Sequence, residues 1–140
     1  MIILDTNIAS VLISPSHRDL ATILAWQRAS ADQDMRITAI TRAEIMFGVA
    51  ILPDGAKRSR LVESVAHFLM ETAGLILPFG AAEADAYGAI MASRRSAGRP
   101  MGVLDAQIAA TARVVGATLA TRNIKDFVEC GIAVVDPYAA

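Results

Sequence analysis

The chain has 140 residues, with 13 basic and 14 acidic side chains and a formal net charge of −1. This length suits one domain with a sizeable core, and we expect it to span residues 1–140 without interruption. The balanced charge excludes a uniformly basic nucleic-acid-binding protein, although it is compatible with a local basic patch. The single cysteine, Cys130, excludes a disulfide framework and a cysteine-based zinc site, and it favours a reducing, cytoplasmic setting.

Membrane association is not expected. No apolar run approaches the roughly 18 residues that a membrane span requires. The apolar stretch at the N-terminus is too short for a signal peptide.

In chain order, strands alternate with amphipathic helices. Short apolar runs rich in β-branched residues predict strands at residues 2–4, 36–40, 75–77, 118–120 and 132–135. Apolar residues at helical spacing predict helices after Asp5, after the break at 14–16, from Thr41, across 61–69, over 81–96, around 104–115 and, briefly, near Asp126. This alternation predicts an α/β fold of three layers, with a parallel sheet of about five strands flanked by helices.

Four acidic residues lie where such a fold places its ligands. Asp5 ends the first strand, Glu44 lies in the first helical turn after the second, and Asp126 follows the fourth. Asp105 lies near the start of a helix, just after the break at 98–102. Ligands of open parallel sheets bind beyond the carboxyl ends of the strands, so we expect these side chains to converge.

Each acid also has a purely structural interpretation. Asp5 suits a helix N-cap, and Asp105 suits the positive end of a helix dipole. Thr41-x-x-Glu44 matches a capping box, and Asn123-x-x-Asp126 resembles one. Capping explains the four acids less well together, because their neighbours are apolar and buried carboxylates need a compensating cation. Converging carboxylates suit Mg²⁺ or Mn²⁺, which can activate water to hydrolyse a phosphodiester.

Four segments resemble the PIN-domain toxins of the VapC/FitB type. They are LDTNIAS at 4–10, ITAITRAEIMFGVAIL at 37–52, VLDAQIAATARVVGATLATRNIKDF at 103–127 and VVDPY at 134–138. The resemblance covers nearly the whole chain in order. It implies a PIN-like fold, Mg²⁺- or Mn²⁺-dependent ribonuclease activity that stops growth, and neutralisation by a cognate antitoxin, a small DNA-binding protein encoded beside it. It also implies a homodimer, in which the alanine-rich helix at 81–92 packs against the second subunit.

Carried over by position, the resemblance implies that Asp5, Glu44 and Asp105 are catalytic metal ligands, supported by Thr6 and Thr121. Some members of the family carry a fourth acid at the position of Asn123, whereas others have the form seen here, with the acid at Asp126. We favour Asp126 as the fourth catalytic and metal ligand. Asn123 would then support the site or contact the substrate.

Basic residues form three groups. They are Lys57, Arg58 and Arg60; Arg94, Arg95 and Arg99; and Arg122 with Lys125. The second and third groups precede Asp105 and Asp126, and we expect them to contact RNA phosphates or the antitoxin. For the group at 57–60, an ordinary solvated helix face is an equal alternative.

Two other classes of protein compete with this interpretation. A non-catalytic PIN-like module that binds RNA or protein would not need the four acids. A phosphatase of the haloacid-dehalogenase type would need Asp-x-Asp where this chain has Asp5-Thr6-Asn7. Dinucleotide- and nucleotide-binding enzymes would need G-x-G-x-x-G or a P-loop, and neither motif occurs.

Overall fold

A computed structural model describes residues 1–139 of the chain. Within this range the strands are β1 (Ile2–Leu4), β2 (Met35–Thr38), β3 (Ile76–Leu77), β4 (Thr118–Ala120) and β5 (Ala133–Val135). The helices are α1 (Thr6–Ile13), α2 (Leu20–Ala29), α3 (Ala39–Ala50), α4 (Ala56–Glu71), α5 (Ala81–Ser96) and α6 (Val103–Val115), with a 3₁₀ turn, η1 (Ile124–Phe127). None of these helices is long and apolar enough to cross a membrane.

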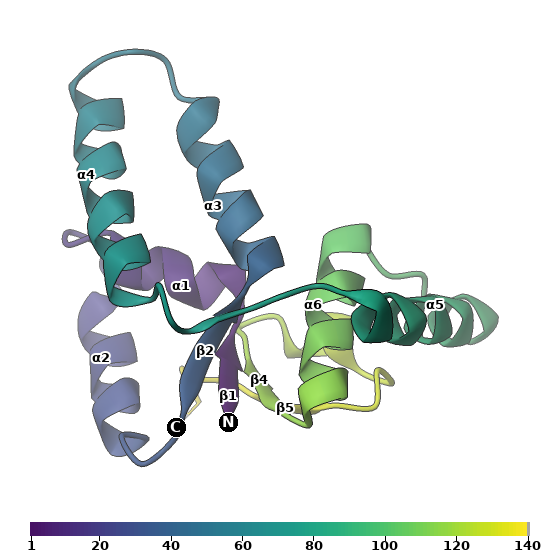
Figure 1. Cartoon of the computed structure of the whole chain (residues 1–140). Helices are drawn as coiled ribbons and strands as arrows, with labels where there is room; N and C mark the ends of the chain where they lie inside the picture. The colour runs from purple at the N-terminus through teal and green to yellow at the C-terminus, as the bar shows by residue number, and fades with distance from the viewer. Residues whose placement is uncertain (140) are drawn as a thin grey trace.

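The described strands form one parallel sheet in the order β3-β2-β1-β4-β5. Figure 1 shows α1, α2 and the α3–α4 hairpin on one side of the sheet, and α5 and α6 on the other. The expected three-layer α/β fold is therefore confirmed. Side chains alternate along β1, so Ile2 and Leu4 pack into the core beneath α1 and α4, whereas Ile3 packs into the core beneath α5 and α6.

One element boundary differs from the prediction. The second strand was expected over 36–40 with a helix from Thr41, but β2 ends at Thr38 and α3 begins at Ala39. The hydroxyl oxygen of Thr38 accepts a hydrogen bond from the Thr41 backbone N–H at 3.0 Å and caps the helix. The apolar residues continue past the cap to Ile40, and this unbroken run is why the strand was predicted to extend to residue 40.

The helix α6 is fixed at both ends by backbone conformation. Gly102 precedes its first turn in an extended conformation. Gly116 ends it in the left-handed region, with a φ of 67° that a side chain would strain. Thr118 and β4 follow two residues later. The short connection returns the chain directly to the edge of β1.

Candidate active site

Asp5 lies at the carboxyl end of β1, in the centre of the sheet. The register pairs Leu4 with Ala120, so the next residues along the two strands, Asp5 and Thr121, stand side by side. The Asp5 carboxylate is 5% exposed and caps α1, accepting the Thr6 backbone N–H at 2.8 Å through Oδ1. Its Oδ2 accepts the Thr121 hydroxyl at 2.7 Å. The capping interpretation of Asp5 is therefore correct, but it accounts for only part of the carboxylate.

The Thr121 hydroxyl is oriented by its other partners. It accepts the Asn123 backbone N–H at 3.0 Å and the Asn7 side-chain amide at 3.3 Å, so its own hydrogen points to Asp5. The Asn7 amide also lies 3.3 Å from Oδ2 of Asp5. Asn7 was not predicted as a site residue. Its position two residues after Asp5, at the strand-to-helix turn, was the available signal.

Glu44 is held next to Asp5 by a series of hydroxyl groups. The Thr6 hydroxyl donates to Oε1 of Glu44 at 2.8 Å and lies 3.0 Å from the Thr41 hydroxyl. Thr38 in turn donates to Thr41 at 3.4 Å. The predicted capping box of Thr41 and Glu44 is wrong, because Thr38 caps α3 and the Glu44 side chain is bound to Thr6 instead.

Asp105 and Asp126 complete a group of four acids that influence one another electrostatically. Asp105 lies in the first turn of α6, as predicted. Its pKa is raised by burial first, and then by repulsion from Asp5, Asp126 and Glu44. The pKa of Asp5 is also raised, chiefly by burial and further by Asp126, although its hydrogen bonds from Thr121 and Thr6 oppose the shift. Because the Asp105 carboxylate responds to all three of the other acids, the four lie in one region of the fold.

Asp126 reaches this region from η1. The backbone N–H of Asp126 donates to the Asn123 carbonyl at 3.0 Å, and Asn123 makes no side-chain cap. The box suggested for Asn123 and Asp126 is therefore wrong, which leaves the Asp126 carboxylate unused by capping. Its carboxylate is near enough to Asp5 and Asp105 to contribute to the raised pKa of each.

The donor set fits a hard divalent cation. Within residues 1–139, none of Asp5, Glu44, Asp105 and Asp126 forms an ion pair with a basic side chain. Four carboxylates without a basic partner in this range offer only oxygen ligands, the type that Mg²⁺ and Mn²⁺ prefer. In the described residues, however, no three of these groups stand close enough to form a complete set of metal ligands as they lie.

Arg94 has a different role from the predicted contact with substrate or antitoxin. Its side chain is 5% exposed. Nε donates to the Arg99 carbonyl at 2.7 Å, and Nη1 donates to the carbonyls of Asp126 at 3.0 Å and Val128 at 2.7 Å. These hydrogen bonds lie inside the protein and join the end of α5 to the turn that carries Asp126.

The other predicted contact residues are at the surface. Arg95 and Lys125 are exposed, and Arg99 lies 3.8 Å from Glu129 in a long ion pair. The Arg122 guanidinium stacks on the Tyr138 ring, 4.6 Å from its centre, and lies 3.7 Å from Asp19. These four cations remain accessible from solvent.

Comparison with known proteins shows the family to which the chain belongs. The family model of the PIN domain matches residues 2–130. The chain is a member of the PIN domain family. This PIN domain is 35% identical to "VapC ribonuclease Y4jK" of Sinorhizobium fredii over 99% of its length and 98% of the relative, and 34% identical to "Toxin FitB" of Neisseria gonorrhoeae over 99% of each. It superposes on the crystal structure of FitAcB from Neisseria gonorrhoeae with a TM-score of 0.88, at 35% identity and with all of both chains covered.

Proposed function

We propose that this PIN domain is the toxin of a toxin–antitoxin pair and acts as a metal-dependent endoribonuclease. The observation that carries the proposal is the group of carboxylates around Asp5 and Asp105, where burial and then neighbouring acids raise the pKa of both and no basic side chain of the described residues forms an ion pair with them. The relatives named as a ribonuclease and as a toxin support the same activity. Free of its antitoxin, the protein would cleave RNA and so inhibit translation and growth.

The four acids, Asp5, Glu44, Asp105 and Asp126, would hold Mg²⁺ or Mn²⁺. When bound, such an ion supplies a Lewis acid and lowers the pKa of a water molecule, the chemistry that phosphodiester hydrolysis needs at neutral pH.

The residues around the acids fix their orientation. The Thr121 hydroxyl and the Thr6 backbone N–H leave Asp5 a single position, and the Thr6 hydroxyl does the same for Oε1 of Glu44. Hydrogen bonds of this kind around metal ligands commonly contribute 10- to 100-fold, by order of magnitude, to affinity or activity. Asn123 is exposed next to Thr121, where its amide is available to the substrate.

The exposed cations Arg95, Arg99, Arg122 and Lys125 are the proposed contacts for RNA phosphates or for the antitoxin. The partner is proposed to be a small DNA-binding protein encoded beside this chain. Co-expression with that neighbour should relieve the growth arrest that the PIN domain causes alone. Growth arrest that persists with the neighbour present would remove the antitoxin from the proposal.

RNA cleavage tests the activity directly. The wild-type protein should cleave RNA with Mg²⁺ or Mn²⁺ and stop when EDTA is added. Asp5→Asn and Asp105→Asn should each lower the rate by more than about 100-fold, because each removes a proposed ligand rather than a neighbour of one. Asp34→Asn is the matched control, since Asp34 is exposed and pairs with Arg36 at 2.8 Å.

A different result would favour the alternative, a non-catalytic module that binds RNA or protein. In that case the wild-type protein and both variants would give the same RNA pattern, with and without metal. Circular dichroism of each variant establishes that the fold is intact.

A further inference from the structure

The basic group at the start of α4 divides into two parts in the structure. Arg58 is neutralised, because its Nη1 lies 2.6 Å from Oδ1 of Asp54, one helical turn away. Lys57 and Arg60 are exposed, and within residues 1–139 neither has a carboxylate oxygen within 4.0 Å. The candidate active site uses neither of them. Two adjacent cations therefore remain uncompensated on one side of the helix.

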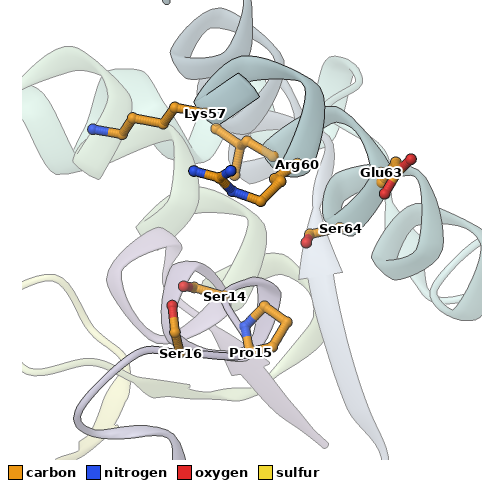
Figure 2. A pocket seen from close by; sticks show the side chains of 8 residues that line it. Ser14, Pro15, Ser16, Lys57, Arg60, Glu63 and Ser64 are labelled. Atoms are coloured by element: carbon orange, nitrogen blue, oxygen red, sulfur yellow. The ribbon is translucent and has the colours of Figure 1, made fainter. Parts of the chain in front are cut away.

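Lys57 and Arg60 line a hollow of about 680 Å³ between α4 and the loop that follows α1. Figure 2 shows the Arg60 guanidinium above Ser14, with the hydroxyls of Ser14 and Ser16 facing it from the loop. Glu63 also contributes to the wall, but its carboxylate is directed away from both cations. The groups that face one another across the hollow are thus the Arg60 guanidinium and two hydroxyls, while Lys57 lines its edge with its side chain extended away from the loop.

This hollow adjoins a second one that reaches Glu44. The second, of about 320 Å³, has Thr6 and Glu44 in its wall and shares Ser14, Lys57 and Leu61 with the first. A continuous depression therefore leads along α1 and the α3–α4 hairpin from the acidic group to the two cations.

We propose that Lys57 and Arg60, assisted by Ser14 and Ser16, bind a backbone phosphate of RNA on nucleotides beyond the cleaved bond. This phosphate subsite rests on the proposed ribonuclease function. The acids around Asp5 repel a polyanion, so a strand that enters needs cations elsewhere to hold it. Ammonium, guanidinium and hydroxyl groups supply donors that match phosphate oxygens.

An acidic protein segment would also be attracted by Lys57 and Arg60. RNA is favoured because the second hollow has Glu44 in its wall, and the proposed reaction brings a phosphodiester to the acids of which Glu44 is one.

Binding of a fluorescent single-stranded RNA to the Asp105→Asn protein, which is expected not to cleave it, tests the subsite. In that background, Lys57→Gln with Arg60→Gln should weaken binding by about tenfold or more. It should also lower the slope of log affinity against log salt by about 0.7, since one phosphate contact on a single strand contributes about that much. The matched control is Arg28→Gln with Arg58→Gln, which removes the same charge at exposed or already paired positions.

Three outcomes would overturn the subsite. If wild-type protein cleaves RNA but the Lys57 and Arg60 double variant binds it with the affinity and salt slope of the control, the subsite is wrong and the ribonuclease function stands. If wild-type protein neither cleaves nor binds RNA, the subsite and the proposed ribonuclease function fail together. If the double variant loses affinity for the purified antitoxin alone, the cations belong to a protein interface. Circular dichroism and unfolding curves of both double variants establish that each is folded.

Discussion

Two buried charges in this protein are compensated in opposite ways. Asp5 and Arg94 are each 5% exposed, and neither forms an ion pair within residues 1–139. The Arg94 guanidinium donates to three backbone carbonyls through Nε and Nη1, so the chain itself supplies its partners. Asp5 also accepts hydrogen bonds, but its pKa is raised, chiefly by burial and further by the Asp126 carboxylate.

The difference separates a structural charge from one that still needs a ligand. A buried charge whose partners are all supplied by the fold has no energetic reason to bind anything else. A buried charge whose neighbours have the same sign gains from a counter-ion, and perturbed acids of this kind concentrate at functional sites. Asp126 takes part in both, because its carbonyl binds Arg94 while its carboxylate raises the pKa of Asp105.

The largest predicted effect on stability lies on the Arg94 side of the comparison. Arg94→Met should lower the free energy of unfolding by about 3 kcal/mol, because it leaves three inward-facing carbonyl groups without their donor at a cost of about 1 kcal/mol or more each. Urea unfolding measures the change. Arg95→Met, at the exposed neighbouring position, should stay within about 0.5 kcal/mol of wild type. Equal curves for the two variants would show that the Arg94 hydrogen bonds do not hold the turn at Asp126.

A smaller effect is expected at Thr121, which supports Asp5. Thr121→Val removes the donor to Asp5 and the acceptor for Asn7 and Asn123, and should cost about 1 to 2 kcal/mol of unfolding free energy. It should also weaken stabilisation by Mn²⁺, because Asp5 loses the group that orients it. Thr121→Ser keeps the hydroxyl and should restore the metal effect. A serine variant that behaves like the valine variant would mean that packing, not the hydroxyl, is what matters.

The smallest effect should have the opposite sign. In metal-free protein at pH 7, Asp105→Asn should leave the melting temperature unchanged or raise it, because it removes a carboxylate that three other acids repel. Differential scanning calorimetry in EDTA measures this. A clear fall in melting temperature would show that Asp105 is a stabilising structural acid and would weaken the contrast with Arg94.

The pH dependence of that difference follows from the raised pKa of Asp105. A folded-state pKa above the unfolded value of about 4 means that protonation of Asp105 stabilises the fold. This contribution is fully present below the unfolded-state pKa and is lost as the pH rises through the folded-state pKa. The advantage of Asp105→Asn should therefore be greatest near pH 7 and shrink as the pH is lowered. Unfolding curves in EDTA that show a constant difference from pH 4 to 7 would contradict the shift.

Local patterns predicted the elements and the acids, because both depend on residues near in sequence. Hydrophobic periodicity gave five strands and the helices to within a few residues. The position of Asp5 directly after a buried strand was enough to place it at the sheet edge. The cap of α3 was predicted at Thr41, whereas the structure has it at Thr38. Both residues are threonines in one apolar run, so the local pattern did not distinguish them.

Contacts between distant segments could not be predicted in the same way. Arg94 reads as one of several arginines at the exposed end of a helix, and its partners at 126 and 128 lie more than 30 residues further on. The same holds for Asn7, whose amide meets Thr121 across the sheet. The sequence also could not show which cations of the group at 57–60 lack a partner, because that depends on the ion pair between Arg58 and Asp54.

Calorimetric titration of the metal-free protein with Mn²⁺ tests most directly whether the acids around Asp5 form a cation site. Wild-type protein and the Asp34→Asn control should bind Mn²⁺ alike, whereas Asp5→Asn and Asp105→Asn should each lose at least about tenfold in affinity. Binding that is absent from wild-type protein, or equal in all four proteins, would contradict the assignment of these carboxylates to a metal ion.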